Sequence, residues 1–202
     1  MKQSQRGYSL IELSIVLAII AVIIAGAVSG VQAILRSNNV INTVSDTNKS
    51  VNRIISKLVR DSSYANATML VMTSPGMDVW DAKQVKSGGT ANAVVSNAFG
   101  GRVFVAPLGA DSNGTLSGQG FVYTLTGIPA AACTDVVLGL DGLGAAISVL
   151  NELSTTGTAA KTDLSTGTVV KKPGTALDSS TVAAACNTAT GQASVMLLVP
   201  RS

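Results

Sequence analysis

The first 60 residues fall into three zones of contrasting polarity. Residues 1–7 are polar and basic, residues 8–35 form an apolar run, and residues 36–60 mix apolar and charged positions. From Leu13 to Leu35 there is no Lys, Arg, Asp or Glu, which is enough for a helix of bilayer length. The run contains small residues that would permit close helix–helix approach, namely Ala18, Ala21, Ala25, Gly26, Ala27 and Gly30.

Residues 36–60 predict an amphipathic continuation of that helix. Their apolar positions recur mostly at spacings of three, four or seven, with charged residues largely between them. These apolar positions are Val40, Val44, Val51, Ile55, Leu58 and Val59. Because no proline occurs before Pro75, we expect one helix of about 50 residues, or roughly 75 Å. Its second half would lay an apolar stripe on a globular domain.

From about residue 61 the pattern is typical of turns and short strands. We expect strands at 102–105 and 120–125 with a turn at 111–114, a helix-prone piece and then an ambiguous stretch within 130–153, a surface loop at 154–180, a short helix at 181–186 and a last strand at 193–199. The last strand is apolar enough to lie centrally in a sheet.

The amino-acid composition and charge limit which functions the chain can have. The chain of 202 residues is 47% hydrophobic and only 3% aromatic, and it has no histidine, which argues against a histidine base or metal ligand. The net charge is +3, and the basic residues Lys2 and Arg6 precede the apolar run, as the positive-inside rule expects. Without them the charge is too small for an electrostatic case for nucleic-acid binding. We find no nucleophile elbow, P-loop or convincing acid pair, so no enzyme is expected.

The two cysteines, Cys133 and Cys186, lie far downstream of the apolar run. An N-terminal insertion signal would place them outside the cytoplasm, where a disulfide can form. Closing a loop of roughly 50 residues is worth about 4 kcal/mol in the chain-entropy model. The alternative is two buried free thiols.

Glu12 is the lone carboxylate at the start of the apolar run, five residues after Gly7. Three kinds of N-terminus fit the run: a secretory signal peptide cut near residues 25–27, an uncleaved signal anchor, or a leader cut after Gly7 with the helix retained. A signal peptide or an uncleaved anchor gains nothing from Glu12. A cut after Gly7 frees an amine at Tyr8, which the Glu12 of a neighbouring subunit could neutralise.

Such a pair has a clear physical use. At about 4 Å and an effective dielectric constant near 20, it is worth on the order of 4 kcal/mol before desolvation. The cost of removing both charges from water cancels much of that attraction, so the pair would mainly set the axial register between neighbouring subunits. A misplaced subunit would bury Glu12 without a partner. The free energy of docking would therefore depend steeply on the position of the subunit along the fibre axis.

The segment Gly7-Tyr8-Ser9-Leu10-Ile11-Glu12 and the apolar helix after it resemble the class III signal of type IV pilins and pseudopilins. The resemblance implies that Gly7 precedes the cut and that Tyr8 becomes the first mature residue, N-methylated by the prepilin peptidase. Glu12 takes the place of the family's glutamate. The implied pilin fold is α+β, a long N-terminal α-helix packed on an antiparallel β-sheet, and the assembled form is a helical fibre.

Three downstream segments resemble type IVb pilins in particular. They are 97–101, 123–129 followed by Cys133, and 186–191 followed by the last strand. Within that group the chain resembles the bundle-forming and toxin-coregulated pilins, and the thin pilins of conjugative plasmids and pathogenicity islands are a further candidate group. The seven-residue leader and a tyrosine at the first mature position depart from the type IVb pattern.

These observations divide the chain into a leader (1–7), a hydrophobic transmembrane and polymerisation helix (8–35), an amphipathic helix (36–60) and a globular head (61–202) with a disulfide-bounded C-terminal region. The implied function is that of a pilus subunit serving adhesion, bundling or conjugative cell contact, without cofactor or metal. The implied partners are copies of the chain, the prepilin peptidase, an inner-membrane assembly platform, the membrane before assembly, and a host or recipient cell surface. The implied location is the inner membrane and then the extracellular pilus of a Gram-negative bacterium.

Other interpretations stay open. The chain could be a minor pilin or a type II secretion pseudopilin, or, in another class, a secreted periplasmic binding protein whose mature form begins near Val28. The pairs Asp135 with Asp141 and Asp78 with Asp81 are expected to be solvated loop carboxylates rather than a calcium site. Trp80 and Tyr123 are expected to be packing residues.

Overall fold

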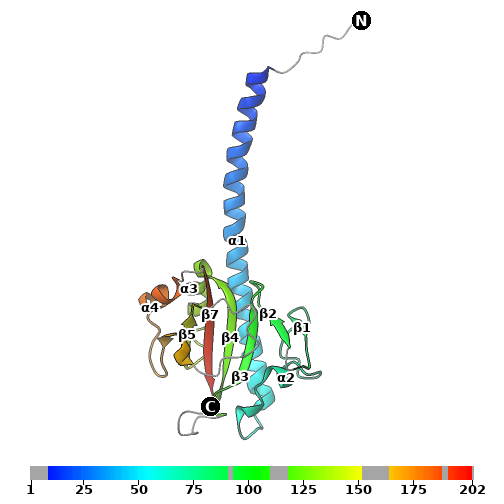
Figure 1. The fold of residues 1–202 in the computed structure, drawn as a ribbon, viewed down its shortest axis with the longest axis vertical. Helices are drawn as coiled ribbons and strands as arrows, with labels where there is room; N and C mark the ends of the chain where they lie inside the picture. The colour runs from blue at the N-terminus through cyan, green and yellow to red at the C-terminus, as the bar shows by residue number, and fades with distance from the viewer. Residues whose placement is uncertain (1–8, 91–92, 110–117, 152–163, 188–190, 202) are drawn as a thin grey trace. The chain divides into compact units, whose positions relative to one another are not determined.

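The computed structural model describes residues 9–90, 93–109, 118–151, 164–187 and 191–201. The chain forms two compact units, Met1–Asn38 and Asn39–Ser202. One helix, α1 (Leu10–Leu58), begins in the first unit and ends in the second (Figure 1). Its 49 residues confirm the prediction of a single helix of that length. Glu12 in its first turn and Lys57 in its last turn match the helix dipole.

The part of α1 in the first unit is exposed on all sides. Every described residue from 9 to 38 is exposed, including Leu10 at 87% and Ile11 at 69%. Among the described residues, α1 is the helix long and apolar enough to cross a membrane, a criterion that a signal sequence near the N-terminus also meets. An apolar surface of this extent needs a membrane or another protein to cover it.

The second unit is built on one antiparallel sheet of seven strands in the order β1-β2-β3-β4-β7-β5-β6. The strands are β1 (Val85–Ser87), β2 (Val94–Ser96), β3 (Arg102–Pro107), β4 (Gly120–Pro129), β5 (Ala146–Leu150), β6 (Thr168–Lys171) and β7 (Gln192–Pro200). The long strands β4 and β7 pair at the centre of the sheet, and the edge strands β1 and β6 are short.

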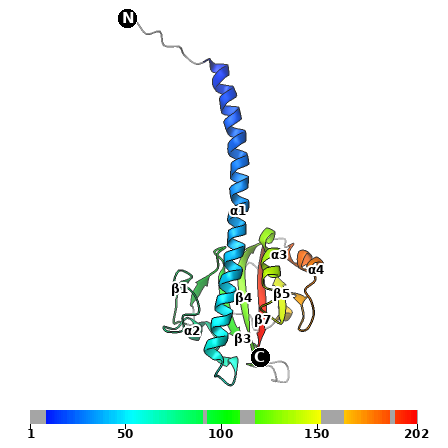
Figure 2. The ribbon, with the colours of Figure 1, turned by 180° about the vertical axis from the view of Figure 1, so that it is seen from behind.

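The second part of α1 covers one face of this sheet, as Figure 2 shows from behind. Its buried residues Val51, Ile54 and Leu58 join the same core cluster as Phe121 and Leu197 from the central strands. Alternate residues of β4, β5 and β7 point to the opposite face, where Val122, Leu150 and Met196 form a second cluster. The predicted α+β class with a helix on an antiparallel sheet is therefore confirmed.

The predicted apolar stripe of α1 is right except at its end. Val51 and Leu58 are buried, and Val40, Val44 and Ile55 pack against the core. Val59 is 64% exposed, because α1 ends at Leu58 and Val59 lies in the turn that follows. The sequence analysis did not select Ile54, which is fully buried.

The remaining helices are α2 (Met69–Met72), α3 (Ala130–Gly139) and α4 (Ser179–Cys186), with 3-10 turns η1 (Tyr64–Asn66) and η2 (Leu164–Thr166). Buried residues of α3 and α4, such as Val136 and Val182, belong to the core cluster that α1 joins. Helix α4 contains the short helix predicted at 181–186.

Two sequence predictions need correction or extension, and a third falls on residues that the structure does not describe. The loop predicted at 154–180 is wrong at β6, where only Val170 of four residues is buried, too weak a pattern to detect. The strand predicted at 120–125 continues to Pro129, because a bulge after Leu125 with Gly127 at φ +68° lets pairing resume at Ile128. The turn predicted at 111–114 lies outside the described residues.

Candidate functional site

Glu12 lies in the first turn of α1, where the backbone N–H groups of Glu12 and Leu13 both donate to the carbonyl of Ser9. Its neighbours Ile11 and Leu13 are 69% and 54% exposed, so the carboxylate lies on an apolar surface. Among the described residues, no hydrogen bond or ion pair engages that carboxylate. The helix N-terminus favours the charge only in part, so Glu12 can still take a cationic partner. Gly7 and Tyr8 lie outside the described residues.

The hydroxyl groups in the apolar part of α1 are satisfied within the helix. Ser14 Oγ donates to the carbonyl of Ile11 at 2.8 Å, and Ser29 Oγ donates to that of Ala25 at 3.2 Å. These bonds remove the cost of burying the hydroxyls in an apolar setting. The carboxylate of Glu12, by contrast, has no such bond within the described part of its helix.

A buried polar cluster joins α1 to the sheet. Ser50 of α1 and Tyr123 of β4 share a hydrogen bond of 2.9 Å, and Trp80 Nε1 donates to the same Tyr123 oxygen at 3.2 Å. All three residues are buried, and desolvation raises the pKa of Tyr123, which keeps its hydroxyl neutral. Sequence analysis identified Trp80 and Tyr123 as packing residues but did not anticipate these hydrogen bonds.

The segment that contains Trp80 is further tied to α1 by charged side chains. Arg53 donates to the carbonyl of Val79 at 3.2 Å and to Asp81 at 3.3 Å, and Lys57 donates to the carbonyl of Gly76 at 3.2 Å. The Arg53–Asp81 pair is exposed and contributes little by itself. The bonds to backbone carbonyls matter more, because they hold an irregular segment against the helix.

Asn97 organises the turn between β2 and β3, one of the segments that resemble type IVb pilins. Its Nδ2 donates to the carbonyl of Thr126 at 2.8 Å, and its Oδ1 accepts from the backbone of Phe99 and Gly101, each at 3.0 Å. The bond to Thr126 therefore holds this turn against the bulge of β4. The side chain is buried and uses both of its polar atoms.

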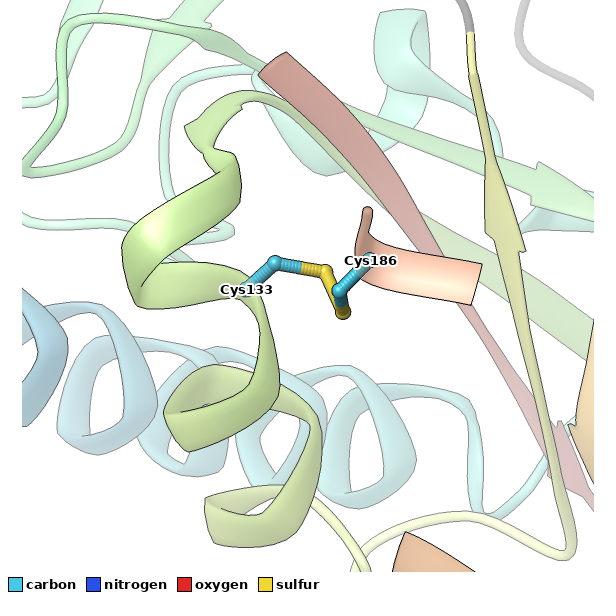
Figure 3. Close-up of a disulfide and its surroundings, with 2 residues drawn as sticks. All are labelled: Cys133 and Cys186. Atoms are coloured by element: carbon cyan, nitrogen blue, oxygen red, sulfur yellow. A yellow bond between two sulfur atoms is a disulfide. The ribbon is translucent and has the colours of Figure 1, made fainter. Parts of the chain in front are cut away.

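The disulfide joins Cys133 of α3 to Cys186 at the end of α4 (Figure 3), with the two Cα atoms 5.6 Å apart. Both cysteines are buried in the core cluster. Hydrogen bonds from Thr181 and Ser180 lower the pKa of Asp178, which caps α4 as a carboxylate. The disulfide thus fastens a capped surface helix to the rest of the second unit.

Two of the four candidate acid residues form ion pairs, and Asp135 lies in α3 rather than in the loop that was expected. Asp81 pairs with Arg53, and Asp141 forms an ion pair of 2.7 Å with Lys171. Across the part of the chain that the structure describes, no group of three or more metal-ligating side chains is found.

Comparison with known proteins supplies the context for this geometry. A family model for the prokaryotic N-terminal methylation motif matches residues 2–28. No curated protein matches the chain in sequence. Two solved structures are similar along most of the chain. The type IVb pilin of Salmonella typhi has a TM-score of 0.54 at 20% identity, covering 79% of this chain and 98% of the pilin. TcpA, a type IV pilin of Vibrio cholerae, has a TM-score of 0.52 at 17% identity, covering 80% and 98%.

The chain has the fold of type IV pilins. Together with the methylation motif, the pilin fold supports a pilus subunit. The motif and the apolar helix also fit a membrane-anchored precursor that becomes part of an extracellular pilus.

Proposed function

We propose that this chain is the structural subunit of a type IV pilus and polymerises into an extracellular helical filament for adhesion, bundling or conjugative contact. One observation carries the proposal: a single chain combines the N-terminal methylation motif at residues 2–28 with the fold of type IV pilins. The motif accounts for the apolar helix, and the fold accounts for a head domain to display.

In this proposal a prepilin peptidase cuts between Gly7 and Tyr8 and methylates the new amine of Tyr8. Before the cut, the inner membrane of a Gram-negative cell holds α1, with Lys2 and Arg6 on the cytoplasmic side. An inner-membrane assembly platform then extracts the mature subunit into the fibre.

The exposed apolar side chains of α1 supply the driving force that keeps subunits together. Burying one Leu, Ile or Val side chain is worth about 1.5–3 kcal/mol in water, and α1 exposes many such side chains between Leu10 and Leu35. That force has no direction along the fibre axis. The pairing of Glu12 with a neighbour's Tyr8 amine would add the axial register that hydrophobic burial lacks.

The head domain suits display outside the cell. Its disulfide closes a separation of 53 residues and fastens α4 to α3. Exposed short helices are prone to local unfolding, so the bond protects a part of the surface that a host or recipient cell would meet.

The experiment is to shear surface fibres from cells that express the chain, to image them and to identify their subunits. The proposal expects filaments in which this chain is the main component. A trace amount in fibres made of another subunit would indicate a minor pilin. Accumulation as a free monomer outside the membrane would indicate a secreted binding protein and contradict the proposal.

A further inference from the structure

A polar pocket of the second unit lies between α1 and the short strands at one edge of the sheet. Its cavity of about 510 Å³ falls in the range of small-molecule sites, about 300–1,000 Å³. It is lined by residues of α1, of β1 and the turn before it, and of β2 and the turn after it. Of these lining residues, all but Ala98 and Gly100 carry a polar side chain, so the pocket suits a hydrophilic ligand.

The more buried side chains of the pocket are fixed by hydrogen bonds within the protein. Gln84 Nε2 donates to Asp46 Oδ2 at 3.2 Å, and Gln84 Oε1 accepts from the backbone N–H of Asp81 at 3.1 Å. Asn97, which also lines the pocket, uses its two polar atoms in its own turn and on Thr126. A ligand would therefore meet a preformed surface, which lowers the entropic cost of binding.

Other side chains of the lining keep hydrogen-bonding capacity for a ligand. Asn39 and Asn42 lie three positions apart on α1, so they are neighbours on the helix surface. Within the described residues, no hydrogen bond engages the side-chain amide of Asn39 or Asn42, or the hydroxyl of Ser96. An amide group both donates and accepts hydrogen bonds, as a sugar hydroxyl does, so these groups match a ligand that carries several hydroxyls.

Two lysines make the pocket electropositive. Lys83 and Lys86 are exposed and, in the described part of the chain, form no ion pair. The carboxylate of the lining belongs to Asp46, which accepts the hydrogen bond from Gln84 and has Lys49 Nζ at 3.9 Å. Two ammonium groups beside one compensated carboxylate favour an anionic ligand.

We propose that this pocket binds an acidic sugar, a saccharide ring that carries a carboxylate. The two lysines pair with the carboxylate, and the amides of Asn39 and Asn42 bind the ring hydroxyls. A bare phosphate would use the lysines but leave the amides unpaired, and a nucleobase would find no aromatic side chain in the lining on which to stack. The proposal is independent of fibre assembly, because all of these residues belong to one chain.

The test uses the full chain, isotope-labelled and held in detergent micelles. Nuclear magnetic resonance follows the side-chain amides of Asn39 and Asn42 during separate titrations with sodium glucuronate, glucose, acetate and phosphate. We expect glucuronate to shift the signals of both amides. It should bind about tenfold or more tightly than glucose, which lacks the carboxylate, and than acetate or phosphate, which lack the ring hydroxyls.

Two double variants complete the test. Lys83→Gln with Lys86→Gln removes both charges of the pocket and should weaken glucuronate binding about tenfold. Arg60→Gln with Lys172→Gln is the matched control, because it removes two exposed charges that do not line the pocket, and it should bind glucuronate as the original chain does. The proposal is overturned if glucuronate leaves both amide signals unshifted, if glucose, acetate or phosphate binds as tightly as glucuronate, or if the two double variants bind glucuronate equally.

Discussion

Tyr123 Oη and Ser50 Oγ lie 2.9 Å apart in the interior of the second unit. This hydrogen bond connects the central strand β4 to α1 across 73 positions of sequence. Trp80 Nε1 donates to the same phenolic oxygen, so one hydroxyl ties together the sheet, α1 and the segment before β1. A buried hydroxyl with two partners helps to define a single packing of helix on sheet.

Tyr123→Phe should therefore change the response of stability to alkaline pH. Burial raises the pKa of Tyr123 above its ordinary value of 10.0. The unfolded chain then releases its proton at a lower pH than the folded chain, so the contribution of this tyrosine is fully present below pH 10 and falls as pH rises past it. Denaturant titrations at several pH values measure the free energy of unfolding. We expect that free energy to fall above about pH 10 more steeply in the original chain than in Tyr123→Phe.

At neutral pH the same variant should lose about 1–3 kcal/mol, because Trp80 is left without its acceptor. Tyr64→Phe is the matched control, since Tyr64 is also buried and, in the described residues, its hydroxyl has no hydrogen-bond partner. Equal stability and equal pH dependence in the two variants would show that the Tyr123 hydroxyl has no structural role.

Glu12→Gln should permit membrane insertion and leader cleavage while strongly reducing fibre assembly. The amide keeps the size of the side chain but cannot neutralise a neighbour's amine. The measurement compares sheared fibres with total mature subunit by immunoblot. Ser14→Ala is the control on the same helix, because its hydroxyl bonds only within α1. Normal fibres from Glu12→Gln would remove the role assigned to the carboxylate.

Cys133→Ser should loosen α4 without dismantling the sheet. In the chain-entropy model, loss of a cross-link over 53 residues costs about 4 kcal/mol. We expect limited proteolysis to cut in or next to α4 at lower protease concentration, and reduction of the original chain to have the same effect. Unchanged protease resistance in both cases would mean that packing alone holds α4.

Gly101→Ala should be severely destabilising, whereas Gly100→Ala should be mild. A Cβ at Gly101 would lie 1.7 Å from the carbonyl oxygen of Thr126, so β3 and the bulge of β4 would have to separate. Gly100 has φ +83° with nothing within 4 Å of its Cβ position, and its cost is the backbone strain of about 1–2 kcal/mol. Thermal unfolding of the two variants checks the order, and similar melting temperatures would contradict it.

Much of this architecture could be predicted because α1 and the central strands carry strong local signals. Twenty-three consecutive uncharged positions without proline predict a helix, and the mostly apolar run from Phe121 to Leu125 matches a strand covered on both faces. The prediction that the last strand lies centrally also holds, since β7 pairs with β4 on one side and β5 on the other.

The elements that sequence analysis missed depend on contacts made elsewhere in the chain. Strands β1 and β2 have three residues each and exist because a neighbouring strand pairs with them. The hydrogen bonds of Asn97 reach Thr126, 29 positions away, and the sulfur of Met69 reaches Val105, 36 positions away. No local pattern encodes such a partner, so these contacts of Asn97 and Met69 emerge only in the fold.

The most direct test of the account is mass spectrometry of the mature N-terminus of the chain purified from cells. A fibre subunit made through the methylation motif should begin at Tyr8 and carry one additional methyl group on its amine. A mature chain that begins near Val28, or one that retains residues 1–7, would contradict the account.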